Sequence, residues 1–126
     1  GAEGRSLPLW PVWDGFLLPV PLKNVPAYRR LARLAGKVWL EHGALDYREC
    51  QADDLGTPMG AVFRDAVKLK RGETVFFSYI TYKSRAHRDR VNAKMMKDPR
   101  MKMDMAALPF DAKRMAYGGF KVIVEA

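Results

Sequence analysis

Two histidines are the residues of this sequence best suited to proton transfer near neutral pH. His42 and His87 are the only histidines among 126 residues, and an imidazole titrates close to neutrality. Each also has a structural explanation. His42 continues the apolar stripe of one predicted helix and can cap its end, whereas His87 lies in the first turn of another, where the helix dipole favours a neutral ring. We expect both histidines to cap helices, and we keep proton transfer as the functional hypothesis.

A second set of polar and aromatic residues is predicted to line a pocket between helices and sheet. Asp14 lies inside a predicted central strand, where a carboxylate needs a partner, and we expect that partner to be an arginine. Asn92 is the one amide on the inner side of its helix and could polarise a ligand carbonyl. The aromatic members of this candidate pocket are Trp39, Tyr79, Tyr82 and Tyr117. Ordinary core packing is the alternative explanation for all of them.

The net charge of +8 favours an anionic partner. Basic residues gather between residues 83 and 102, and the candidate anion-binding residues are Arg85, Arg88 and Arg114. A solvated helix face explains the same charge pattern and is the more common outcome.

Nucleic-acid binding is disfavoured by the sequence of the third predicted strand. RNA-recognition motifs stack bases on aromatic side chains of two central strands, and Phe16, Phe77 and Tyr79 could imitate that arrangement. The basic, glycine-rich and aromatic run of those motifs is absent, however. Weak phosphate binding by the second helix, without sequence preference, stays as an alternative.

Metal and cofactor chemistry find no support in the motifs. The two histidines and the single cysteine, Cys50, match no usual ligand spacing, and the glycine loops and nucleophile elbows of nucleotide-binding and hydrolase folds are missing. We therefore predict no metal and no cofactor, and no reaction class follows. A lone cysteine and the lack of a long apolar run favour the cytoplasm and no membrane span. We expect the Cys50 thiol to be buried.

The elements that must position these residues follow from hydrophobic periodicity. One helix begins at Asn24 and ends at Gly43, and another is capped by Ser84 and ends at Asp98. The loop of residues 53–73 contains a short helical pattern and is expected to form the rim of the pocket. Strands are predicted at residues 12–20, 44–52, 74–82 and 114–125, and residues 1–10 are interpreted as a poorly ordered extension to a single domain of residues 11–126.

The order of these elements predicts an α+β fold of ferredoxin-like, split β-α-β form. It places two helices on one face of a four-stranded antiparallel sheet. The strands at 12–20 and 74–82 become central. In both strands the odd and the even positions carry apolar side chains, so Phe76 and Phe77 point to opposite faces of the sheet. A single chain would leave one apolar face bare, so we predict a homodimer through that face.

Several segments resemble the YbaA-like family of bacterial proteins, a domain of unknown function numbered 1428. They are DGFLLPVP (residues 14–21), EHGALDYREC (41–50), ETVFFSYITYKSRAHRDRVNAK (73–94), DPR (98–100) and PFDAKRMAYGGF (109–120). The resemblance implies a dimeric α/β barrel in which two sheets face each other, and it implies no activity.

Residues and resemblance together predict a small dimeric protein that binds an organic, anionic or aromatic molecule between sheet and helices. Whether the protein also converts that molecule is left open. The alternatives are a non-enzymatic interaction or stress-related module and the weak nucleic-acid binding described above.

Overall fold

The computed structural model describes residues 10–126, so the predicted extension lies outside the described residues except for Trp10. Single-turn 3-10 helices lie at Leu22–Asn24, Pro99–Met101, Met105–Ala107 and Ala112–Arg114. The strands and α-helices are β1 (Val12–Pro21), α1 (Val25–Glu41), β2 (Asp46–Gln51), α2 (Ala61–Ala66), β3 (Glu73–Tyr82), α3 (Arg85–Lys97) and β4 (Ala116–Lys121). Within the described residues, no helix has the length and hydropathy that a membrane crossing requires.

The predicted helix ends are confirmed, with one difference in how they are held. The Ser84 hydroxyl accepts a hydrogen bond of 3.1 Å from the backbone N–H of His87, and Gly43 has a φ of +113° after α1. Asn24 occupies the N-cap of α1 but makes no capping bond. Its side-chain amide instead donates to the carbonyl of Pro109 at 3.1 Å. That bond joins the start of α1 to a segment 85 residues further along the chain.

The sheet is antiparallel and has the strand order β2-β3-β1-β4, so β1 and β3 are central as predicted. One transverse row of paired residues crosses the sheet from Glu49 to Ser78, Phe16 and Tyr117. The next row runs from Tyr47 to Ile80, Asp14 and Gly119. Because both rows belong to the same alternating set, their side chains all leave the sheet on one face.

The fourth strand is shorter than predicted. β4 spans Ala116–Lys121 rather than residues 114–125, and Lys121 pairs with Val12, the first residue of β1. One further backbone hydrogen bond, from the Val122 N–H to the Pro11 carbonyl at 2.9 Å, follows that pair, and Val122 itself lies outside the strand. At the other end Arg114 belongs to a 3-10 turn and bonds to Glu73.

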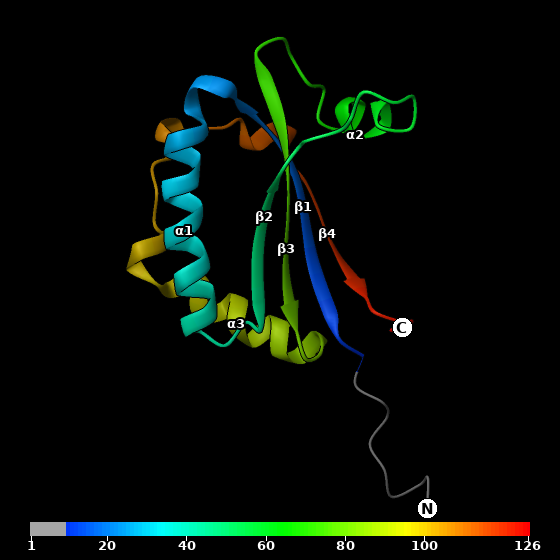
Figure 1. Ribbon diagram of the computed structural model, residues 1–126. Helices are drawn as coiled ribbons and strands as arrows, with labels where there is room; N and C mark the ends of the chain where they lie inside the picture. Colours follow the sequence, from blue (N-terminus) through cyan, green and yellow to red (C-terminus); the bar gives the residue numbers. More distant parts are fainter. Residues whose placement is uncertain (1–9) are drawn as a thin grey trace, which may run out of the picture.

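The two faces of the sheet differ in what covers them. α1 and α3 lie on one side of the sheet, whereas α2 and its loop lie on the other (Figure 1). Phe76 faces the helices and is 3% exposed, while its neighbour Phe77 faces away and is 43% exposed. Trp13 and Phe120 are exposed on the same face as Phe77. The predicted alternation is therefore confirmed, and it leaves apolar side chains in water on the face away from α1.

Two predictions about this second face were wrong. The 53–73 loop does not form the rim of a pocket between helices and sheet, because it packs on the opposite face, where Leu55 and Phe63 approach Val75. Cys50 is exposed rather than buried. It belongs to the edge strand β2 and points away from the helices, so residues 10–126 leave its thiol exposed.

Candidate functional site

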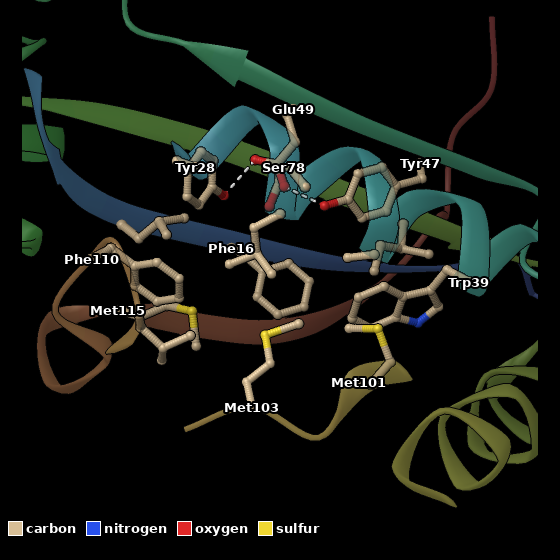
Figure 2. Close-up of a pocket in the computed structure, with 16 residues that line it drawn as sticks. Phe16, Tyr28, Trp39, Tyr47, Glu49, Ser78, Met101, Met103, Phe110 and Met115 are labelled. Carbon is tan, nitrogen blue, oxygen red and sulfur yellow. Dashed lines mark hydrogen bonds between the residues drawn. The ribbon is translucent and has the colours of Figure 1, made fainter. Parts of the chain in front are cut away.

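A cavity of about 210 Å³ lies between α1, the helix-facing side of the sheet and residues 98–115 (Figure 2). We call it the inner cavity, and residues 98–115 the rim segment. Its walls are aromatic, aliphatic or thioether side chains apart from Glu49, Ser78 and the hydroxyls of two tyrosines. The lining residues are Phe16, Leu18, Tyr28, Leu31, Ala32, Ala35, Trp39, Tyr47, Glu49, Ser78, Ile80, Met101, Met103, Leu108, Phe110 and Met115.

Glu49 is held in this cavity by two tyrosines from different elements. The Tyr28 hydroxyl, from α1, donates to Glu49 Oε1 at 2.7 Å. The Tyr47 hydroxyl, from the same strand as Glu49, donates to Oε2. Figure 2 shows the two rings on either side of the carboxyl group, with Met101, Met103 and Met115 across the cavity from it. We call Glu49, Tyr28 and Tyr47 the carboxyl–tyrosine cluster.

Burial controls the protonation of this cluster. It raises the pKa of the Glu49 carboxyl, and the two tyrosine hydrogen bonds oppose that rise. Burial and the charge of Glu49 also raise the pKa of both tyrosines, so the phenols stay protonated and act as donors. No Lys, Arg or His of the described chain forms an ion pair with Glu49. Any negative charge on the cluster therefore lacks a cationic partner within residues 10–126.

A second polar network surrounds Asp14, which is 1% exposed. Arg88 Nη1 donates to Asp14 Oδ1 at 3.1 Å, so the predicted arginine partner is confirmed. Asn92 Nδ2 donates to the other oxygen, Oδ2, at 3.4 Å. In turn Asn92 Oδ1 accepts from Trp39 Nε1 and from the Tyr82 hydroxyl, each at 3.3 Å. The Asn92 amide is thus committed to protein partners.

The Asp14 network brings together most of the predicted pocket. Arg88 also donates to the Tyr117 hydroxyl at 3.2 Å, which adds β4 to the network. An outer cavity of about 400 Å³ lies beside it, and it shares Phe16, Trp39, Met101 and Met115 with the inner cavity. The predicted residues gathered here are Asp14, Trp39, Tyr82, Arg88, Asn92 and Tyr117.

The structure places three other predicted pocket residues elsewhere. Tyr79 lies on the opposite face of the sheet and stacks on Trp13, with ring centroids 4.8 Å apart. His42 is the C-cap of α1, and its Nε2 lies 2.8 Å from Asp98 Oδ2. His87 accepts from the backbone N–H of Lys83 at 3.0 Å. None of these three lines the inner or the outer cavity.

Each candidate anion-binding arginine lies close to a carboxylate of the chain. Arg85 is exposed and lies 3.7 Å from Asp89, and Arg88 is bound to Asp14 as described. Arg114 forms a bidentate ion pair with Glu73, with N–O distances of 2.8 and 2.6 Å. Its Nε also donates to Asp111 Oδ2.

The aromatic residues considered for base stacking do not share a surface. Phe16 faces the helices and packs against Tyr117, whereas Phe77 and Tyr79 lie on the other face of the sheet. They cannot form one stacking platform, because a strand directs odd and even residues to opposite sides. Residues 10–126 also contain no group of three or more His, Cys, Asp or Glu side chains placed to hold a metal ion.

Sequence reasoning missed the carboxyl–tyrosine cluster, although a signal for part of it was present. Alternation along the predicted strand at 44–52 places Tyr47 and Glu49 on the same face. Tyr28 lies in the predicted helix that begins at Asn24, at helical spacing from Ala32 and Ala35. The methionine-rich rim segment has neither helical nor strand periodicity.

Residues 12–112 match the protein family described as "Protein of unknown function (DUF1428)". The chain belongs to this family. It is 46% identical over 112 residues to "Uncharacterized protein YbaA" of Escherichia coli strain K12, and to the protein of the same name in Shigella flexneri. Each alignment covers 89% of this chain and 96% of the relative. The resemblance stated from the sequence is therefore confirmed, and the DUF1428 match spans Asp14, Glu49 and both tyrosines of the cluster.

Gly36 of α1 provides a test of how tightly the cluster is packed. Alanine is normally favoured over glycine inside a helix by about 1 kcal/mol. A Cβ on Gly36, however, would lie 2.8 Å from the Tyr47 ring. We expect Gly36→Ala to lower the free energy of unfolding by about 1–3 kcal/mol, because the ring must move away from Glu49.

Urea denaturation of Gly36→Ala measures this effect. Gly56→Ala is the matched control, since nothing lies within 4 Å of the added Cβ there, and it should change stability by less than about 0.5 kcal/mol. An increase in the stability of Gly36→Ala would show that Tyr47 moves aside freely and that the cluster is not held by packing.

Proposed function

We propose that this DUF1428-family protein binds a small, largely apolar organic molecule in the inner cavity, with or without converting it. The observation that carries the proposal is an apolar cavity of about 210 Å³ with one carboxyl–tyrosine cluster in its wall. Binding sites for small molecules are typically concave and apolar, with few, well-placed polar groups. An apolar cavity of about 150 Å³ can hold benzene. The inner cavity therefore suits one aromatic ring with a short substituent.

The charge of the lining residues favours a neutral or cationic ligand over an anionic one. The net charge of the chain is +8, but among the described residues no Lys, Arg or His lines the inner cavity. Its ionisable side chains are Glu49, Tyr28 and Tyr47. An anion would face a carboxyl group without a compensating cation.

The rim segment supports a cavity that adapts to its contents. Met101, Met103 and Met115 are unbranched, flexible side chains that fill irregular spaces. The segment is fastened near its two ends by the pairs His42–Asp98 and Arg114–Glu73. In this proposal His42 and Arg114 position the rim segment and do not touch the ligand.

Thermal-shift and NMR titrations with indole and phenol test the proposal. We expect at least one of the two probes to produce a saturable shift. Ala35 lines the inner cavity, so Ala35→Leu should fill the space and abolish that shift while the protein stays folded. Ala106→Leu, a change at an exposed residue of the rim segment, is the matched control and should bind as the unmodified protein does. No shift with either probe, or binding that survives Ala35→Leu, would contradict the proposal.

We further propose a ferredoxin-like domain that forms a dimer through the sheet face opposite α1, which would give a dimeric α/β barrel. The strand order β2-β3-β1-β4 with α1 and α3 on one face supports this form. Exposed Trp13, Phe77 and Phe120 supply an apolar surface that a second sheet could cover at about 10 Å. Light scattering at micromolar concentration should give twice the chain mass of 14.3 kDa.

A cytoplasmic location is part of the same proposal. The free thiol of Cys50 lies exposed on β2, and exposed thiols persist best in a reducing compartment.

A further inference from the structure

Resting on the proposed function, we infer that the ligand of the inner cavity is an amine: an aromatic or alkyl body with a protonated amino group that binds the Glu49 carboxylate. The cluster supplies a carboxylate whose two oxygens already accept from Tyr28 and Tyr47. Phenol donors stabilise the charge but do not neutralise it. Glu49 is half-buried, and charges removed from water in proteins are normally paired with an opposite charge. An ammonium group is the partner that this carboxylate lacks.

Ser78 provides an independent observation in the same place. It lies directly across from Glu49 in the pairing of β2 with β3, is 4% exposed and lines the inner cavity. Among the hydrogen bonds of the described residues, none involves its hydroxyl. An ammonium carries three N–H donors. Glu49 can accept one of them and Ser78 another, so the two residues form a ready set of acceptors.

The aromatic walls fit the rest of an amine. The rings of Phe16 and Trp39 line the same cavity as the carboxyl–tyrosine cluster, which itself contributes the ring of Tyr28. The face of an aromatic ring attracts a cation that lies within about 6 Å. The apolar body of the amine would lie against the methionines of the rim segment. A carboxylic acid of the same shape would instead bring a second negative charge to Glu49.

Glu49 also borders a surface groove between α1 and the edge strand β2, and a role for Glu49 in that groove is the rival explanation for its charge. The groove is lined by Arg29, Arg33 and Lys37 of α1, together with Glu49 itself. None of these three cations is within the 4.0 Å that defines an ion pair with Glu49 among the described residues. Ala35 lines the inner cavity and not the groove, so a change there separates the two sides.

Calorimetric titration with three probes of one shape tests the inference. The probes are 2-phenylethylamine, 2-phenylethanol and phenylacetate. We expect the amine to bind at least about tenfold more tightly than the alcohol, because a charge-assisted hydrogen bond replaces a neutral one. Phenylacetate should bind more weakly than the alcohol. Ala35→Leu should abolish binding of the amine and the alcohol together.

Two variants test whether Glu49 and Ser78 cause the preference for the amine over the alcohol. Glu49→Gln should lower the affinity for the amine by about tenfold or more and leave the affinity for the alcohol within about threefold. Ser78→Ala should lower the affinity for the amine by a smaller factor, and it keeps the test usable if Glu49→Gln folds poorly. Asp46→Asn is the matched control, since it removes a carboxylate from the exposed face of the same strand and should leave amine binding unchanged.

The outcomes separate the inference from the function on which it rests. If the alcohol binds as tightly as the amine, or if Glu49→Gln and Ser78→Ala both keep the preference for the amine, the inference is overturned while the proposed function stands. If amine binding survives Ala35→Leu, the amine lies in the groove and the inference is also overturned. If none of the three probes binds, and indole and phenol fail as well, the proposed function itself is wrong.

Discussion

Replacing Arg88 by methionine should lower the free energy of unfolding by about 3–5 kcal/mol at pH 7, because it leaves a buried carboxylate without its cation. Asp14 is 1% exposed, and Arg88 is the basic residue that contacts it. Methionine keeps much of the apolar stem of arginine, so the change removes mainly the charge and its hydrogen bonds. Urea denaturation of the variant and of the unmodified protein measures the difference.

The pH dependence of this loss has a definite sign. Burial already raises the pKa of Asp14 above 3.8, against the lowering effect of Arg88 and Asn92. Without Arg88 the folded-state pKa rises further, while the unfolded-state value does not change. An acid whose pKa is raised by folding destabilises the protein at high pH, and the penalty fades as the pH falls through the folded-state pKa toward 3.8. The deficit of Arg88→Met should therefore be smaller at pH 4.5 than at pH 7.5.

Two further variants check the cause. Arg85→Met removes an exposed arginine that lies 3.7 Å from Asp89, and it should cost less than about 0.5 kcal/mol. Combining Arg88→Met with Asp14→Asn should recover most of the loss, because a neutral amide replaces the unpaired charge. A double variant as unstable as Arg88→Met alone would instead assign the loss to the bond between Arg88 and Tyr117 or to packing.

The faces of the sheet could be predicted from the sequence because strand alternation is a local property. Phe76 and Phe77 are neighbours, so one of them had to face the helices and the other had to face away. The pairing of Asp14 was predicted on a different ground, because a carboxylate inside a central strand needs a partner such as an arginine. The identity of that arginine needed the structure, since Arg88 reaches Asp14 across 74 residues of sequence.

Tyr79 shows where the sequence reasoning about the pocket failed. The predicted aromatic pocket contains both Tyr79 and Tyr82 of the third strand. Residues three apart in a strand point to opposite faces, however, so the two do not line one pocket. The odd or even position in the strand, rather than aromatic character, decides which face a side chain covers.

The inner cavity could not be predicted, because it depends on contacts between segments far apart in the chain. The rim segment has no helical or strand periodicity, and a bond between Asn24 and Pro109 brings it back to α1. For the same reason the 53–73 loop was assigned to the wrong face. Val67 is the one fully buried apolar side chain of this loop. Its local sequence does not indicate the face of the sheet against which it packs.

A carboxylate at the centre of the exposed sheet face should convert the proposed dimer into a monomer. Phe77 is 43% exposed on β3, a central strand, and lies beside Tyr79 on that face. In a two-fold dimer Phe77→Glu would bury a charge from each chain without a cation. Such losses at the core of an interface reach several kcal/mol, so the dissociation constant should rise by at least about 100-fold.

Analytical ultracentrifugation of Phe77→Glu at micromolar concentration should therefore give one chain mass of 14.3 kDa, against two for the unmodified protein. The variant should stay folded, because Phe77 belongs to neither hydrophobic core cluster of its own chain. Met96→Glu is the matched control: it introduces the same charge at an exposed apolar residue of α3, on the helix side, and should remain dimeric. If Met96→Glu dissociates and Phe77→Glu does not, the interface lies on the helices and the open face needs another partner. If the unmodified protein already has the mass of one chain, the apolar face stays in water and the proposed dimer is wrong.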